Sequence, residues 1–242
     1  MMVLGMMGRS IVAAARMAWV LWPWTLGLLA LDLAQSFAGY VGKTPTAVAL
    51  VQVAGFAVTA LVTLRFYAGH LDVDWRAVLA DRAQRSRFVA WYCFIGLLDL
   101  IGLPQGLAGH VPPLAALVCE LGAYYFLLRL IAVLPAVVAW RTWPGVDRIW
   151  NAGGVLAWRI ALFSFVMMLI AGTLVTLAAL AVHPDMHALT ADRQRLAASL
   201  DKLGPTWLLV MSVVTALIEM VSFAFDVACF RVVSSTPTQR AT

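Results

Sequence analysis

The chain has 242 residues, of which 63% are hydrophobic and only 12% are charged, and its formal net charge is +5. Soluble domains carry about 25% charged residues, so this composition excludes an ordinary soluble protein and indicates a membrane protein. The positive charge is not gathered into a basic run or interleaved with aromatic residues, which argues against nucleic acid as a partner.

The apolar segments are continuous, as in membrane helices, and do not alternate as barrel strands do. Hydrocarbon offers the backbone no hydrogen-bond partner, so each segment is predicted to be a helix. At about 1.5 Å per residue, each covers the roughly 30 Å hydrocarbon core. We therefore predict an all-α fold with 1–242 as a single six-helix membrane domain, its spans at about 18–40, 44–68, 88–108, 113–140, 156–182 and 206–232.

The N-terminal segment also loosely resembles a signal peptide. Arg9 and Arg16 precede the apolar stretch, and Ser36-Phe37-Ala38 lies near its end like a cleavage site. The stretch is too long for a signal peptide and contains Asp32, so we favour a retained membrane span.

The basic residues are distributed unequally between the two sets of loops. With a cytoplasmic N terminus, 13 of the 17 fall in or toward the cytoplasm, and only Lys43, Arg193, Arg195 and Lys202 lie outside. Such an excess in short loops marks the cytoplasmic side. The sequence thus predicts a multi-pass protein of a bacterial-type cytoplasmic (inner) membrane with both termini in the cytoplasm.

Two loops have the apolar spacing of amphipathic helices, which we expect to lie on the membrane surface. The stripe in the predicted inner loop consists of Leu71, Trp75, Val78 and Leu79. The stripe in the predicted outer loop consists of Leu189, Leu196, Leu200 and Leu203. Both are interpreted as connectors, with docking of a partner subunit as the alternative.

The sixth predicted span carries a polar face. Steps of three and four residues separate Ser212, Thr215, Glu219, Ser222 and Asp226, which places them on one side of a helix. This face is predicted to point into the bundle, because lipid does not tolerate it. Arg129 on the fourth span falls at about 25 Å depth, between Glu219 and Asp226 at about 20 and 30 Å. We predict an ion pair of Arg129 with one of these carboxylates, which would lock the helices together.

Three further carboxylates, Asp32, Asp99 and Glu120, fall at one level, roughly 12–14 Å from the outer ends of their spans. A shared level suggests a cation or proton site. Depth does not fix the direction of a side chain, so they could equally face apart and stay protonated.

The chain has no recognisable metal or catalytic motif. Its cysteines are scattered and are interpreted as small core residues: Cys93, Cys119 and Cys229. Three histidines fall at the predicted outer surface, and Pro184 lies between two of them: His110, His183 and His187. No metal and no cofactor is predicted, and neither a Gly-rich phosphate loop nor GxSxG nor HExxH is found.

The segment from the fourth to the fifth span resembles a known family. It contains Arg129-Leu130, Leu134-Pro135-Ala136, Trp150, Gly153-Gly154 and Trp158-Arg159, and the chain later has Ala228-Cys229-Phe230-Arg231. This resembles the membrane domain found beside bacterial glycerophosphodiester phosphodiesterases and related uncharacterised six-span bacterial membrane proteins. The match covers about a third of the chain, and Ile149-Trp150-Asn151 departs from the family's usual Ser-Trp. The resemblance implies a fold and a location; the soluble phosphodiesterase domain is absent, so it implies no activity.

Within this segment, Pro135 is predicted to bend the end of the fourth helix. Arg141, Arg148 and Arg159 crowd the predicted cytoplasmic surface, where they could contact anionic lipid headgroups. The positive-inside rule alone also explains these three arginines.

These features predict a non-enzymatic integral inner-membrane protein, an accessory or lipid-associated component of a membrane system. Its expected partners are membrane lipids and partner membrane subunits. The alternative is a small ion- or proton-coupled transporter in which Asp32, Asp99, Glu120 and Glu219 line a path, although no repeat relates the two halves. A membrane enzyme acting on lipid comes last, because no nucleophile-base constellation is found.

Overall fold

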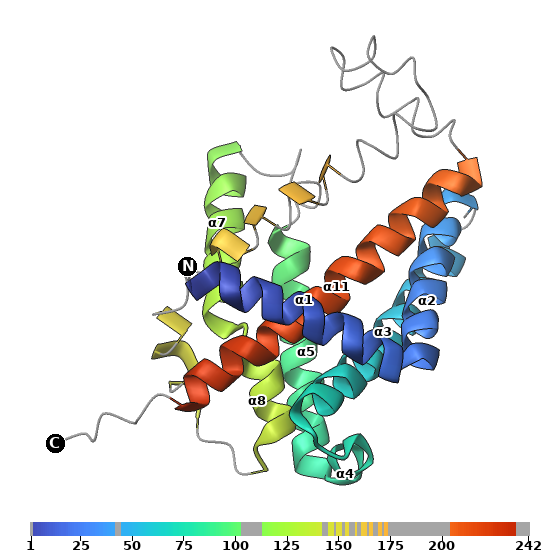
Figure 1. The fold of residues 1–242 in the computed structure, drawn as a ribbon. Coiled ribbons are helices and arrows are strands. Elements are labelled where there is room, and N and C mark those ends of the chain that lie inside the picture. The colour runs from blue at the N-terminus through green and yellow to red at the C-terminus, as the bar shows by residue number, and fades with distance from the viewer. Residues whose placement is uncertain are drawn as a thin grey trace, which may run out of the picture. The chain divides into compact units, whose positions relative to one another are not determined.

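The computed structural model describes residues 2–41, 45–102, 113–141 and 204–235, with shorter pieces between 145 and 173. This part of the chain is helical and contains no strand, which confirms the predicted all-α class. In chain order the helices are α1 (Met2–Val20), α2 (Trp22–Val41), α3 (Pro45–Leu71), α4 (Trp75–Ala80), α5 (Arg82–Gly102), α7 (Pro113–Leu130), α8 (Val133–Ala139) and α11 (Gly204–Ser235) (Figure 1).

Three stretches of the described helices are long and apolar enough to cross a membrane: Val53–Leu71, Leu121–Ala139 and Ser212–Ser235. A bent pair, Gly8–Val20 with Trp22–Ala34, would be a fourth if its two halves form one span. These stretches coincide with predicted spans two, four and six, and the pair includes most of the first. Six spans and cytoplasmic termini remain predictions.

Several predicted features lie outside the described residues. They are most of the fifth span, the outer surface helix, the three outer histidines, Arg148 and Arg159, and the side chains of Asp99 and Glu120.

The first span begins differently from the prediction. A continuous helix from about 18 was expected, but α1 ends at Val20 and α2 starts at Trp22, with a bend of 99° between them. Pro23 explains the break, because proline has no N–H to donate to the preceding turn and fits only the first turn of a helix. The Thr25 hydroxyl bridges the bend by donating to the carbonyl oxygens of Ala18 and Leu21, at 3.2 and 3.3 Å.

The fourth span is interrupted close to Pro135. Helix α7 ends at Leu130 and α8 begins at Val133. The ring of Pro135 would collide with the carbonyl of Ile131, four residues earlier, in a continuous helix. The structure has a helix break before Pro135, and the predicted bend stays a prediction.

The predicted inner surface helix is short. Helix α4 spans only Trp75–Ala80 with Val78 buried, and Leu71 instead ends α3. Asp74 caps α4 by accepting from the backbone N–H of Arg76 at 3.0 Å. Asp81 accepts from the N–H groups of Gln84 and Ala83 at the start of α5, and this hydrogen bonding holds the pKa of Asp81 below its usual value.

The chain divides into two compact units. The first comprises Met1–Ala13, Thr63–Phe163 and Phe223–Thr242, and the second comprises Ala14–Val62 and Ser164–Ser222. Within the first unit, α5 packs against α4, α7 and α8. Gln84 of α5 is buried there, and its side-chain amide donates to the carbonyl oxygens of Val137 and Val138 at 2.8 and 2.9 Å.

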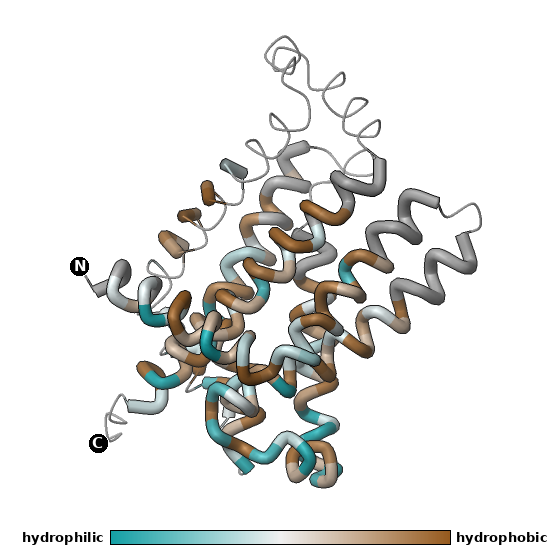
Figure 2. The backbone as a smooth tube through the Cα atoms, turned by 45° about the vertical axis from the view of Figure 1, so that its right-hand side comes forward, coloured by the Kyte–Doolittle hydropathy of each residue, from teal (hydrophilic) through white to brown (hydrophobic). Residues whose placement is uncertain are grey.

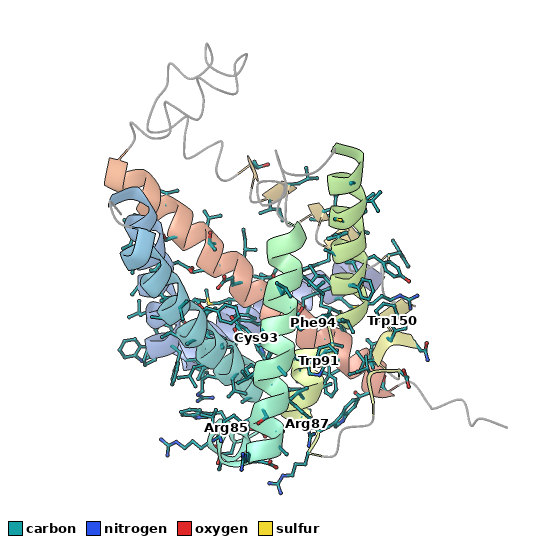
Figure 3. The ribbon with its side chains drawn as sticks, turned by 180° about the vertical axis from the view of Figure 1, so that it is seen from behind. Arg85, Arg87, Trp91, Cys93, Phe94 and Trp150 are labelled. Atoms are coloured by element: carbon teal, nitrogen blue, oxygen red, sulfur yellow. The ribbon has the colours of Figure 1, made fainter. Side chains whose placement is uncertain are left out.

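Large apolar side chains are exposed along the long helices. Three examples are Val53 on α3 (70% exposed), Leu121 on α7 (61%) and Trp158 in the short pieces after α8 (63%). Figure 2 shows these helices largely in hydrophobic colours, with hydrophilic colours gathered around α4. Figure 3 shows Arg85 and Arg87 at the start of α5, with Cys93 and Phe94 farther along the same helix. This pattern of an apolar exterior and charged helix ends is the one expected of a membrane protein.

Candidate functional site

The sixth predicted span contributes Asp226 to a part-buried hydrogen bond. The hydroxyl of Tyr67, near the end of α3, donates to Asp226 Oδ2 on α11 at 2.5 Å. Tyr67 is only 2% exposed, so the pair lies inside the first unit. A carboxyl group removed from water needs such a partner, because an unpaired one is costly to bury.

Aromatic rings pack along the same end of α11. Phe223 lies one turn before Asp226 on α11 and packs edge-on against the Tyr67 ring, with 5.6 Å between the ring centroids. Phe225 stacks on Phe163 at 3.7 Å, and Phe230 packs edge-on against Trp140 at 4.9 Å. The end of α11 is thus fixed by apolar packing on several sides, and the Tyr67–Asp226 bond is its part-buried polar contact.

Arg129 forms a second polar cluster. Its Nε and Nη2 donate to the Tyr125 hydroxyl at 2.9 and 2.7 Å, and its Nη1 donates to the carbonyl oxygen of Trp150 at 3.0 Å. The guanidinium carbon also lies 5.2 Å from the Tyr125 ring centroid and 5.1 Å from that of Trp150, both within cation–π range. All three side-chain nitrogens of Arg129 are therefore used.

Two glycines make room for this arginine. A Cβ added to Gly153 would overlap the carbonyl oxygen of Arg129, and one added to Gly154 would overlap its guanidinium. Arg129, Trp150, Gly153 and Gly154 therefore meet in one cluster, although up to 25 residues separate them in the sequence. The cluster fastens the segment after α8 to the end of α7.

The ion pair predicted for Arg129 with either Glu219 or Asp226 is not formed among the described residues. Arg129 is held by Tyr125 and Trp150, while Asp226 accepts from Tyr67. A phenol and a peptide carbonyl satisfy the guanidinium without a carboxylate, so no charged partner is required. Depth alone suggested the pairing, and neighbouring aromatic residues decided otherwise.

The polar face of α11 is only partly buried. Ser212 is 2% exposed, whereas Thr215 is exposed and Ser222 and Glu219 are half-buried. The buried stripe is shifted by about one residue and consists of Ala216, Met220, Phe223, Val227 and Phe230. Apolar side chains therefore set the packed face, and the predicted polar residues border it.

Within the second unit, Asp32 of α2 and Glu219 of α11 interact electrostatically. Each has one buried carboxylate oxygen, Asp32 Oδ2 and Glu219 Oε2, without a hydrogen-bond partner among the described residues. Asp32 comes from the predicted level of three carboxylates and Glu219 from the predicted polar face of the sixth span, so the interaction joins one residue of each set. A shared site of Asp32 with Asp99 and Glu120 stays a prediction, because the last two side chains lie outside the description.

The remaining predicted sites have different outcomes. Arg141 is exposed and its carbonyl oxygen accepts from Arg87 Nη1 at 3.2 Å. Cys229 is buried, as predicted, but Cys93 and Cys119 are exposed, so their interpretation as core residues is wrong. A small, weakly polar thiol suits a lipid-facing surface as well as a core. The described residues contain no group of three or more His, Cys, Asp or Glu placed to hold a metal ion.

Sequence analysis missed Tyr67 as the partner of Asp226. A signal was present, since a buried tyrosine usually finds a partner for its hydroxyl. Tyr67 and Asp226 both lie near the predicted cytoplasmic ends of their spans. Only charged residues at a similar depth were considered as partners of Asp226, and the Tyr67 phenol is uncharged.

Comparison with known proteins adds no relative. The chain matches no protein-family model, no curated protein sequence and no solved structure.

Proposed function

We propose that the chain is a non-enzymatic integral membrane protein that acts as an accessory or lipid-associated component of a bacterial-type inner membrane. Its partners in this proposal are membrane lipids and other membrane subunits. Both termini are placed in the cytoplasm. The observation that carries the proposal is that Asp226, Arg129 and Gln84 of the first unit each have a hydrogen-bond partner within it, while large apolar side chains are exposed.

The interior contacts support a packing role. Asp226 is bound by Tyr67, Arg129 by Tyr125 and Trp150, and Gln84 by two carbonyl oxygens of α8. Side chains engaged in this way hold helices together.

The exterior supports a lipid-covered surface. The exposed valine, leucine and tryptophan side chains of α3, α7 and the following piece would be costly in water, at about 25 cal/mol for each Å² of apolar surface. Hydrocarbon removes that cost. The same surface offers packing sites to another membrane subunit.

Native mass spectrometry after extraction in mild detergent tests this proposal. We expect the chain to carry a defined partner subunit or bound anionic phospholipid. A lipid-poor monomer that also catalyses flux in proteoliposomes would overturn it.

The second candidate is a small ion- or proton-coupled transporter, favoured by the unpartnered carboxylate oxygens of Asp32 and Glu219. If they relay protons, Asp32→Asn and Glu219→Gln should each abolish proton-coupled flux in proteoliposomes while the protein remains folded. Thr215→Val is the matched control, because Thr215 is an exposed residue of the same face of α11. Flux that is absent from the wild-type protein, or unchanged in both carboxyl variants, would exclude this mechanism.

A further inference from the structure

A pocket with basic walls lies in the first unit, apart from the polar clusters described above. Its volume is about 240 Å³, and its polar walls are Arg9 and Ser10 of α1, His70 of α3 and Arg231 of α11. None of the residues that the structure gives for its wall is acidic; the others are the apolar Met6, Ala13, Ala224, Val227, Ala228 and Val232. Two permanent positive charges thus face a small space without a compensating carboxylate.

The donors at this pocket are only partly used. Arg231 Nη2 donates to the carbonyl oxygen of His70 at 2.8 Å, which fixes the guanidinium at the pocket wall. Arg9 Nε donates to the carbonyl oxygen of Gly5 at 3.1 Å, on its own helix. These are the only hydrogen bonds that the described structure gives the two side chains. Both terminal nitrogens of Arg9, and Nε and Nη1 of Arg231, remain available as donors.

Two buried polar atoms also lack a partner here. Ser10 is 2% exposed, and neither its Oγ nor Nε2 of His70 has a hydrogen-bond partner among the described residues. Buried polar groups are nearly always hydrogen-bonded in native proteins. A group that enters the pocket would satisfy both atoms, and it would meet two arginines as it does so.

We propose that this pocket binds a phosphate-bearing anion through Arg9, Ser10, His70 and Arg231. Arginine forks match the oxygens of phosphate with two parallel hydrogen bonds, and a serine hydroxyl and an imidazole supply further donors. The volume is below the roughly 300 Å³ at which pockets for drug-sized ligands begin. It therefore suits a headgroup phosphate or a free phosphate and is too small for a whole lipid.

The position of the pocket agrees with a membrane surface. His70 and Arg231 lie at the ends of the second and sixth predicted spans, where the cytoplasmic headgroups are expected, and basic pockets between helices at this level bind anionic headgroups. The inference deepens the proposed lipid association and rests on it. It names a site other than Arg141, Arg148 and Arg159, which the sequence suggested.

The test uses the purified full-length chain in a phosphate-free neutral detergent. Three probes are titrated separately while thermal unfolding is followed: dihexanoyl phosphatidylglycerol, dihexanoyl phosphatidylcholine and inorganic phosphate. Arg9→Gln and Ser10→Ala are compared with Arg16→Gln, an exposed arginine of the same helix outside the pocket. Arg9 carries the test because Arg231 also supports the backbone at His70.

We expect the anionic lipid to bind the wild-type chain and Arg16→Gln equally. Arg9→Gln should bind it on the order of 10- to 100-fold more weakly, as expected when a charged hydrogen-bonding group is lost. Ser10→Ala should bind it several-fold more weakly. If inorganic phosphate binds with the same dependence on Arg9 and the lipid does not, the ligand is free phosphate and the pocket assignment stands.

Either of two results would overturn the assignment: no probe binds the wild-type chain, or Arg9→Gln binds as Arg16→Gln does. These outcomes are separable from failure of the proposed function. A chain that retains lipid or a partner in native mass spectrometry but ignores Arg9 would keep its general role and lose this site.

Discussion

At the scale of single residues, the hydrogen bond to Asp226 makes Tyr67 more than a packing residue. Removing only its hydroxyl in Tyr67→Phe leaves the carboxyl group without a donor. An unsatisfied buried polar group costs about 1–3 kcal/mol, so the free energy of unfolding should fall by about that amount. SDS titration of the purified chain in mild detergent measures it.

The double variant separates the hydrogen bond from simple packing. Replacing both partners with apolar groups removes the desolvation cost together with the bond, so Tyr67→Phe with Asp226→Leu should recover most of the loss. A double variant less stable than Tyr67→Phe alone would show that Asp226 has another essential contact.

At the Arg129 cluster, adding a methyl group at Gly153 is predicted to lower the stability of the chain. In Gly153→Ala the new methyl group would overlap a backbone oxygen of Arg129, and backbone cannot move aside cheaply. We expect a loss of about 1–3 kcal/mol, as in other overpacked sites, measured in the same SDS titration.

Gly122→Ala on α7 is the matched control, since its Cβ would meet no atom within 4 Å. Alanine also favours a helix over glycine by about 1 kcal/mol, so this variant should be neutral or slightly stabilised. Equal behaviour of the two alanine variants would contradict the close approach of Arg129 and Gly153.

At the residue scale, the sequence carries information about one helix at a time. The three- and four-residue steps predict one inward face of α11, of which Ser212 is buried, Glu219, Ser222 and Asp226 are half-buried and Thr215 is exposed. They could not identify Tyr67, because the direction in which α3 faces α11 depends on both helices and on their packing. Arg129 illustrates the same limit, since its partners came from its own helix and from Trp150 and not from α11.

At the scale of elements, the side chain of Gln84 connects α5 to the end of α8. Its amide donates to the carbonyl oxygens of Val137 and Val138, which lie in the last turn of α8, where carbonyls lack partners within the helix. Gln84→Leu keeps a similar volume and removes both bonds. We expect the chain to lose about 1–3 kcal/mol of stability, again in SDS titration.

Arg82→Gln is the control for this prediction, because Arg82 is an exposed residue at the start of the same helix. It should change stability by less than about 0.5 kcal/mol, as surface substitutions usually do. If Gln84→Leu is as stable as this control, the contact between α5 and α8 does not depend on the amide.

The helix ends show which elements the sequence could and could not define. Pro135 predicts a bend at the end of the fourth span, and the break before α8 lies next to it, because proline acts on its own helix. Pro23 carried the same signal, but the long apolar run around it favoured one continuous span, so α1 was missed as a helix. Ser10 lies on α1 and was therefore not predicted as a site residue. Its position at the basic pocket also depends on residues from α3 and α11.

At the scale of the whole molecule, the membrane assignment rests on composition and helix length together. Among the described residues, every stretch that qualifies by length and hydropathy overlaps a predicted span, and the bent pair includes most of one. The count of six and the orientation depend on loops and charges, which helix geometry does not determine. Reagents that distinguish lipid from water can test both.

The exposed cysteines make this test direct. Cys93 lies 11 residues after Arg82 on α5 (Figure 3), roughly 16 Å along the helix at 1.5 Å per residue. Both Cys93 and Cys119 on α7 are exposed. If hydrocarbon covers these surfaces, a charged maleimide cannot reach either thiol. In membranes both should stay unlabelled, and in SDS both should react.

Arg85→Cys supplies the positive control and the orientation. Arg85 is exposed near the start of α5, where the arginine distribution predicts the cytoplasmic surface. A thiol there should react in inside-out vesicles and stay protected in right-side-out ones. Labelling of Cys93 in intact membranes at the rate of Arg85→Cys would show that α5 lies in water. Labelling of Arg85→Cys only from the outside would reverse the predicted orientation and place the basic pocket on the other surface.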